Sequence, residues 1–172
     1  MDFLSALLNY YQLNEEQYEF LTRPLTYDDL RFDRRIRGLE PLLARIHKAI
    51  DDKEKIIVYG DYDCDGIMST SIIVKVFEML GHTIGYYVPS RYIDGYGLNV
   101  KRVEEIAKKG YTLIITVDNG ISAFEAISLA KQKGIDTIVV DHHEMQGEKL
   151  PDAVSVLHPF VSHLGEYAAS GG

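Results

Sequence analysis

The sequence predicts an α/β protein whose doubly wound, mainly parallel sheet is Rossmann-like and follows a small N-terminal helical extension. From residue 55 onward, short apolar runs rich in isoleucine, valine and tyrosine alternate four times with longer segments of helical periodicity. Such an alternation favours parallel strands covered by helices on both faces. The 172 residues are 46% hydrophobic and 26% charged, which is sufficient for the core of a globular domain.

Helices are expected before the alternating region. Two short ones fall within 2–21, and the second begins at Asn14, a good capping residue that two glutamates follow. A charged connector over 22–38 separates them from an amphipathic helix over 41–52, which starts at Pro41. The expected parts of the chain are an N-terminal helical extension with its linker, 1–53, and an α/β domain, 54–172.

The alternating region contains five expected strands and three expected helices. Each strand is a short run rich in β-branched or aromatic residues, as in KIIVYG, and polar residues or glycine bound most of these runs. Each helix has apolar residues three and four positions apart and ends at a glycine, which readily terminates helices. The expected strands are 55–60, 83–88, 112–117, 136–140 and 153–157, and the expected helices are 67–81, 99–110 and 122–134.

Acidic and imidazole side chains collect where the expected strands end. In an open parallel sheet, ligands bind beyond the carboxyl ends of the strands, near the point where the strand order switches. The third strand is followed directly by Asp118 and Asn119, and the second leads into a loop that contains Arg91. The residues after the first and fourth strands are Asp61, Asp63, Asp65, Asp141, His142, His143 and Glu144. One edge of the sheet is therefore expected to carry at least five carboxylates and two histidines.

This cluster of carboxylates predicts a metal centre. Neighbouring carboxylates raise each other's pKa by repulsion, and divalent cations remove that cost. Mixed carboxylate and imidazole ligands suit Mn²⁺, whereas an all-oxygen set suits Mg²⁺ or Ca²⁺. So many ligands favour a pair of ions about 3.5–4 Å apart, an arrangement that hydrolyses phosphoesters with a hydroxide made from a bridging water. Asp118 follows the expected central strand and is the candidate bridge between the ions.

The run Asp61-x-Asp63-x-Asp65-Gly66 also matches the first half of an EF-hand calcium loop. Such a loop needs a bidentate glutamate at its twelfth position, which is Ile72 here, and it lies between helices rather than after a strand. The calcium-sensor interpretation is therefore excluded. For this run taken alone, a helix cap or turn remains as good an explanation as a metal site, and Asp65 is the candidate cap. Carboxylates at three strand ends are harder to explain by capping.

Composition and charge disfavour several other classes of protein. A net charge of −8 argues against a broad basic surface for nucleic acid, although bound metal ions can supply positive charge locally. Cys64 is the one cysteine, so no internal disulfide forms, and we interpret it as a small packing residue. The N-terminus lacks the basic residues of a signal peptide, and no apolar run approaches the roughly 20 residues of a membrane span. We expect a cytoplasmic protein with no membrane partner.

Three motifs resemble those of the DHH phosphoesterase superfamily. GDYDCDG, VDNG and VDHHE occur in this order after the first, third and fourth expected strands. The segments PSRYIDGYGLN and EKIIVYGDYDCDGI are similar to the RecJ branch of that superfamily, and the resemblance extends over essentially the whole chain. It implies metal-dependent hydrolysis of phosphodiesters by a 5′→3′ exonuclease that acts on single-stranded DNA in recombination and repair.

The resemblance also implies roles for individual residues, with two Mn²⁺ or Mg²⁺ ions in the full-length protein. The implied metal ligands are Asp61, Asp63, Asp65, Asp118 and His142. Catalysis is assigned to Asp118, His142 and His143, and substrate contacts to His143, Arg91 and Asn119. Asp141 either binds metal or orients its neighbours. Tyr59 stands where many members of the superfamily have a histidine, and Asp61 is expected to substitute for it.

Members of this superfamily carry a fourth motif with another metal-binding aspartate, and a second domain that closes over the site. The chain is therefore expected to be an N-terminal fragment, truncated before the fourth motif and inactive by itself. Single-stranded DNA is the expected partner, together with a helicase or a single-strand-binding protein. Two alternatives stay open: a phosphoesterase for oligonucleotides, cyclic dinucleotides or pyrophosphate, and a non-catalytic nucleic-acid scaffold.

Overall fold

The computed structural model describes residues 3–24, 36–93 and 95–162. The chain divides into two compact units, Met1–Asp33 and Arg34–Gly172. In the first unit, the two expected short helices are present as α1 (Phe3–Tyr11) and α2 (Glu15–Thr22). Asn14 caps α2 in a reciprocal capping box with Gln17, as its position in the sequence predicted. The helix after the connector lies in the second unit, and the division at residues 53 and 54 stays a prediction about domain boundaries.

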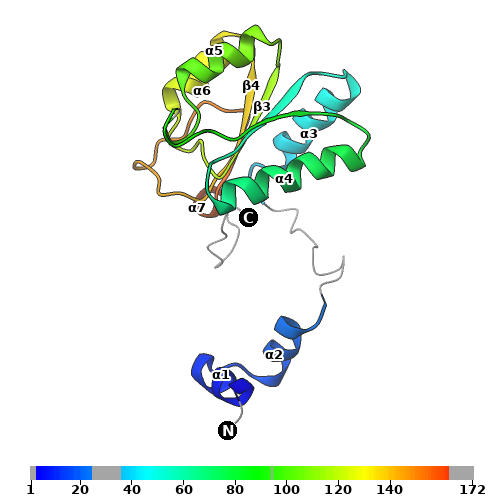
Figure 1. Ribbon diagram of the computed structural model, residues 1–172, viewed down its shortest axis with the longest axis vertical. Coiled ribbons are helices and arrows are strands. Elements are labelled where there is room, and N and C mark those ends of the chain that lie inside the picture. Colours follow the sequence, from blue (N-terminus) through cyan, green and yellow to red (C-terminus); the bar gives the residue numbers. More distant parts are fainter. Residues whose placement is uncertain (1–2, 25–35, 94, 163–172) are drawn as a thin grey trace. The chain divides into compact units, whose positions relative to one another are not determined.

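The second unit is built on a sheet of five parallel strands, which confirms the predicted fold class (Figure 1). The strands lie in the order β2-β1-β3-β4-β5, so the chain runs outward in both directions from the neighbouring pair β1 and β3. This order is that of doubly wound folds with a ligand site at the switch point. The strands are β1 (Ile56–Tyr59), β2 (Gly85–Tyr87), β3 (Leu113–Val117), β4 (Asp136–Val140) and β5 (Ser155–Leu157).

Helices cover both faces of the sheet (Figure 1). On one face, α5 (Val100–Lys108) and α6 (Phe124–Gln132) pack on alternate residues of β1 and β3, including Ile57 and Ile114. On the other face, α3 (Leu39–Asp51) and α4 (Cys64–Met79) pack on the intervening residues, including Ile56, Val58, Leu113 and Ile115. Because both faces are buried at the centre of the sheet, β1 and β3 are nearly continuous apolar runs rather than alternating ones.

Some element boundaries differ from the sequence prediction. Helix α4 begins at Cys64 instead of residue 67, because Asp63 accepts a hydrogen bond from the Gly66 amide and acts as the cap. The cap is therefore Asp63 and not Asp65. Cys64 is exposed, so its interpretation as a packing residue was wrong. A four-residue helix, α7 (Pro159–Ser162), was not predicted. None of the helices within the described residues is long and apolar enough to cross a membrane.

A cluster of ion pairs lies at the amino ends of β1, β3 and β4. The Arg45 guanidinium in α3 lies 2.6 Å from Glu54 and 2.5 Å from Asp136, and Thr112 Oγ1 donates to Glu54 at 2.6 Å. Burial raises the pKa of Glu54, but hydrogen bonds from Arg45 and Thr112 outweigh it and lower that pKa to about 2. The ionised Glu54 carboxylate therefore stabilises the folded state.

Replacing Glu54 by Gln is expected to lower the free energy of unfolding by about 1–3 kcal/mol near neutral pH, because it removes a charge-assisted hydrogen-bonding partner from Arg45. Since the pKa of Glu54 is lower in the folded state than in the unfolded state, its contribution is complete above the unfolded pKa and is lost as the pH falls toward about 2. Urea unfolding at several pH values measures this difference. Glu78→Gln, which breaks an exposed pair with Lys75, is the control and should change stability by less than about 1 kcal/mol. A difference between the two variants that does not shrink in acid would contradict this account.

Candidate metal centre

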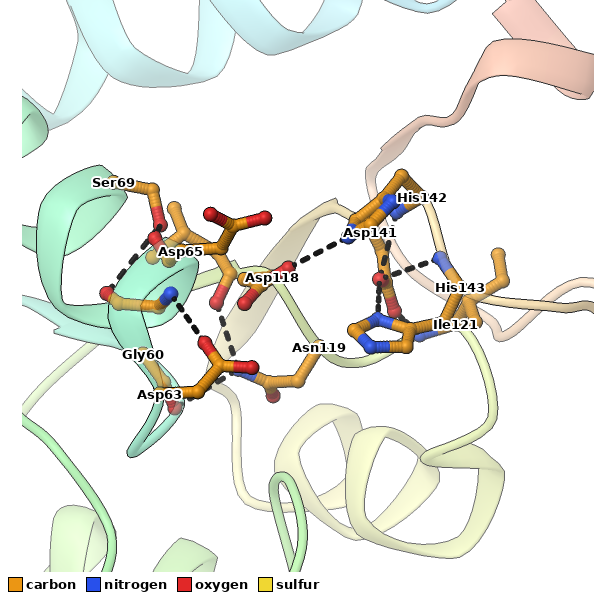
Figure 2. A network of polar contacts seen from close by, with 12 residues as sticks. Gly60, Asp63, Asp65, Ser69, Asp118, Asn119, Ile121, Asp141, His142 and His143 are labelled. Carbon is orange, nitrogen blue, oxygen red and sulfur yellow. Dashed lines mark hydrogen bonds and ion pairs between the residues drawn. The ribbon is translucent and has the colours of Figure 1, made fainter. Parts of the chain in front are cut away.

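The candidate site lies at the carboxyl ends of β1, β3 and β4 (Figure 2). In the register of the sheet, Tyr59 pairs with Thr116, and Val117 pairs with Val140. Continuing these pairings beyond the strand ends brings one row of aspartates together: Asp61, Asp118 and Asp141. The site therefore occupies the point where the strand order switches, as the sequence predicted.

Asp118 occupies the centre of the site. Its backbone lies in the left-handed region with φ of 61°, which is uncommon for a residue other than glycine, and its amide donates to the carbonyl of Val140 at 2.9 Å. The side chain is 1% exposed, and its Oδ1 lies 3.0 Å from His142 Nε2. Strained backbone of this kind is typical of functional sites, where the surrounding structure holds it in place.

Two groups of potential metal ligands share Asp118. Asp61, Asp63 and Asp118 place ligand atoms within 4.8 Å of one another, and Asp118, His142 and His143 do the same. Among the residues that the structure describes, Asp61 Oδ1 and Asp118 Oδ2 are buried without a hydrogen-bond partner. A buried carboxylate oxygen without a partner is costly, and a cation removes the cost. These residues therefore fit a divalent ion, and Asp118 belongs to both groups.

The electrostatics of the site agree with this assignment. Burial, followed by repulsion from Asp63, raises the pKa of Asp118 to about 6. Burial also raises the pKa of Asp61. Without a cation, the clustered carboxylates therefore oppose their own ionisation, which is the cost that a divalent ion would relieve.

Asp141 orients the turn that carries the two histidines. Its Oδ1 accepts the backbone amides of His142 and His143 at 2.7 and 3.1 Å and the Nδ1 of His143 at 2.8 Å. Its Oδ2 accepts the amide of Ile121 at 2.9 Å. Both oxygens are thus used within the protein, which favours the orienting role over the ligand role. Burial lowers the pKa of His143, but the hydrogen bond to Asp141 outweighs it and the pKa is raised.

Residues of the first motif determine how α4 begins and how closely it packs on the end of β1. A Cβ atom on Gly66 would lie 2.5 Å from the backbone nitrogen and oxygen of Asp61, so only glycine fits. Asp63 uses Oδ1 to cap α4 through the Gly66 amide at 3.0 Å. Asp65, in the first turn of α4, belongs to neither group of potential ligands, and its predicted ligand role stays a prediction.

Asn119 differs from its predicted role as a substrate contact. The side chain is fully buried, and its Nδ2 lies within 3.1 Å of the carbonyl oxygens of Tyr59, Gly60 and Val117. It therefore holds the ends of β1 and β3 together rather than facing a substrate. Tyr59 is also fully buried and donates its hydroxyl hydrogen to the Gly97 carbonyl at 3.2 Å, so it anchors a loop. The substitution of Asp61 for the histidine stays a prediction.

The remaining substrate contact from the sequence, Arg91, lies at the surface. Its guanidinium is 5.5 Å from the centre of the Tyr62 ring, in the segment between β1 and α4. A cavity of about 330 Å³ adjoins His143. Its lining includes Tyr96, Leu98, Ile121, Ser122 and Ala123. The Tyr96 ring contacts His143 edge-on, with 5.4 Å between the ring centres.

His158 was missed by reasoning from the sequence. It follows β5 directly, is fully buried, and bonds to the backbone of the turn that carries the two histidines. A histidine directly after a strand was the one available signal. That signal did not place His158 near the site, because β5 becomes a neighbour of β4 only through the strand order of the folded sheet.

Comparison with known proteins supports the motif-based resemblance. A sequence model of the DHH family, N-terminal domain, matches residues 55–171. The single-stranded-DNA-specific exonuclease RecJ of Bacillus subtilis (strain 168) is 42% identical over 124 residues, which cover 72% of this chain and 16% of that protein. RecJ of Dickeya dadantii (strain 3937) is 38% identical over 164 residues, covering 94% of this chain and 28% of that protein. The chain thus spans less than a third of the length of these curated relatives.

Solved structures agree with the sequence matches. A crystal structure of exonuclease RecJ bound to manganese superimposes with a TM-score of 0.74 at 31% identity, covering 86% of this chain and 36% of that one. RecJ from Thermus thermophilus in complex with Mn²⁺ gives a TM-score of 0.74 at 28% identity, covering 96% and 23%. From the match to residues 55–171 and from these identities, we conclude that the chain belongs to the DHH family.

Proposed function

We propose that this chain supplies the metal-binding part of a RecJ-type exonuclease, which removes nucleotides from the 5′ end of single-stranded DNA. The observation that carries the proposal is Asp118, which is shared by two groups of potential metal ligands. Relatives that are 38–42% identical are single-stranded-DNA-specific exonucleases. A role in recombination and repair, with a helicase or a single-strand-binding protein as partner, extends this proposal.

The described residues suit two Mn²⁺ or Mg²⁺ ions. Asp61, Asp63 and Asp118 would hold one ion, and Asp118 with His142 would hold the other. Bound ions of this kind neutralise phosphate charge and supply a hydroxide nucleophile near neutral pH. Asp141 holds Nδ1 of His143, which leaves Nε2 to donate a hydrogen bond to a phosphate oxygen of the substrate. The raised pKa of His143 keeps that donor protonated over a wider pH range.

The cavity beside His143 would accept the uncharged part of one nucleotide. Among the described residues that line it are two carboxylates, Asp141 and Glu144, and no lysine or arginine, so a phosphate group is disfavoured inside it. Tyr96, Leu98 and Ala123 offer apolar surface to a base or sugar. Arg91 lies outside this cavity lining and remains our candidate for contact with a backbone phosphate.

A manganese titration tests the proposal. Calorimetry is expected to show Mn²⁺ binding by this chain, and two Mn²⁺ sites in a protein of the length of the RecJ relatives that carries these residues. That longer protein is expected to degrade 5′-labelled single-stranded DNA. Dinucleotides, offered in parallel, separate an exonuclease from a phosphoesterase for small substrates. Absence of Mn²⁺ binding, or preferential cleavage of dinucleotides, would refute the proposed function.

A further inference from the structure

We propose that His158 is a positioning residue of the metal centre, which fixes the backbone of His143 and thereby the imidazoles of His142 and His143. This inference rests on the metal centre proposed above. His158 belongs to neither group of potential ligands and has no assigned role in that centre. It lies directly after β5 and is fully buried, so its two ring nitrogens need partners within the protein.

Both ring nitrogens of His158 face backbone groups. Nε2 lies 2.8 Å from the carbonyl oxygen of His143, and Nδ1 lies 3.3 Å from the amide nitrogen of Phe160. A carbonyl oxygen can only accept and an amide N–H can only donate, so the two partners select one tautomer. That tautomer is the neutral imidazole with its hydrogen on Nε2, which donates to His143.

The His158 ring is held on a rigid support. The backbone amide of His158 donates to Ser162 Oγ at 3.1 Å, and the amide of Ser162 donates back to the His158 carbonyl at 2.8 Å. Ser162 is also fully buried, and its hydroxyl donates to the Val156 carbonyl at 3.3 Å. The first turn after β5 is thus locked by its own hydrogen bonds, and His158 can act as a fixed anchor.

Leu157 and His158 hold the turn Asp141–His143 at both ends, and we call this arrangement the clamp. At the start of this turn, the amide of Asp141 donates to the carbonyl of Leu157 at 3.0 Å. At its end, the carbonyl of His143 accepts from His158. Two consecutive residues at the end of β5 therefore hold the first and the third residue of the turn.

The clamp determines where the imidazoles point. His142 is the middle residue of the turn, and its Nε2 lies 3.0 Å from Asp118 Oδ1. If the His143 carbonyl is released, the peptide between positions 143 and 144 can rotate, and the turn that carries both rings is held through Asp141 and the Asp141 amide alone. Partners that orient metal ligands are typically worth about 10–100-fold in metal affinity.

Three variants of this chain test the inference by Mn²⁺ titration. His158→Leu removes the donor and should weaken Mn²⁺ binding by about 10–100-fold. His158→Gln places an amide N–H where Nε2 was and should restore most of the affinity. Ser155→Ala removes a buried hydrogen bond to the Gly38 carbonyl from the same strand but leaves His158 and its support intact, so it should lower the melting temperature without changing the affinity. If folded His158→Leu binds Mn²⁺ as the unchanged chain does, or if His158→Gln restores nothing, the inference is wrong.

A metal-free measurement separates this inference from the proposed function. Long-range ¹H–¹⁵N spectra of the unchanged chain should show the Nε2–H tautomer of His158 and one set of imidazole signals for His142 and His143. In His158→Leu, these imidazole signals should shift or multiply, whereas Ser155→Ala should leave them in place. Unaltered imidazole signals in His158→Leu would overturn the inference. If the unchanged chain binds no Mn²⁺, the proposed function fails, but these spectra still decide whether His158 positions the histidines.

Discussion

Replacing Asp118 by Asn is expected to abolish high-affinity Mn²⁺ binding at both sites, with a loss of at least about 100-fold that exceeds the effect typical of outer-shell partners. The reason is that Asp118 belongs to both groups of potential ligands, whereas Asp61 and His142 each belong to one. An amide keeps the size of the side chain but removes its charge, so the fold should persist. Calorimetry with Mn²⁺ on a protein of RecJ length with this change measures the loss, and the same protein should have no nuclease activity above background.

The control for this variant is Asp152→Asn. Asp152 pairs with Lys131 at 2.7 Å, and both side chains are more than half exposed, so the change should leave Mn²⁺ affinity unaltered. Retention of one of the two sites in Asp118→Asn would show that Asp118 does not bridge, and retention of both would refute its role as a ligand.

The same substitution should stabilise the metal-free chain. Because burial and Asp63 raise the folded pKa of Asp118 to about 6, its ionisation costs folding energy, and stability from this group is lost as the pH rises through about 6. An asparagine side chain at this position would carry no such charge. The melting temperature of the metal-free variant is therefore expected to exceed that of the unchanged chain in mildly alkaline buffer and to approach it in acid. Loss of binding with a gain in stability would separate a functional residue from a structural one.

Replacing Gly66 by Ala is expected to destabilise the fold. Gly66 lies in α4, where local propensity alone predicts that alanine stabilises by about 1 kcal/mol. The structure predicts the opposite sign, because the new Cβ would lie 2.5 Å from the backbone of Asp61. Backbone cannot yield as a flexible side chain can, so we expect a net destabilisation of about 1–3 kcal/mol. Urea unfolding measures the change, and Mn²⁺ affinity should fall with it as Asp61 is displaced.

Gly81→Ala provides the contrast for Gly66→Ala. Gly81 has φ of 74° and no atom within 4 Å of the added Cβ, so alanine there incurs only the left-handed backbone penalty of about 1–2 kcal/mol. It should leave Mn²⁺ binding unchanged. A stabilised Gly66→Ala variant with normal Mn²⁺ affinity would contradict the close packing of α4 on Asp61.

Much of the fold could be predicted from the sequence, because its signals are local. Runs such as IIVY and LIITV are long enough and apolar enough to identify buried parallel strands. Asn14 was recognised as a helix cap because a cap is set by the few residues around it. The first and last residues of the helices were harder to predict. The start of α4 was misplaced because Asp63, Asp65 and their neighbours offered competing caps.

The chemistry of the site was also visible in the sequence, but the role of each residue was not. Aspartates after three strands predicted metal ligands, because the carboxyl ends of parallel strands share one edge. Whether Asp141 binds or orients depends on hydrogen bonds with Ile121 and His143, which come from the loop before α6 and from the turn itself. Asn119 could be placed at the edge, but its burial beneath the ends of β1 and β3 could not be predicted.

Local patterns along the chain were sufficient to predict a parallel α/β sheet with carboxylates and histidines after its strands. The folded arrangement was needed to find that two groups of potential ligands share Asp118 and that His158 bonds to the turn at His143. The physical reason is that periodicity specifies elements, whereas the distances between strand ends depend on strand order and register. Those follow from long-range packing of β1, β3, β4 and β5, which no local pattern contains.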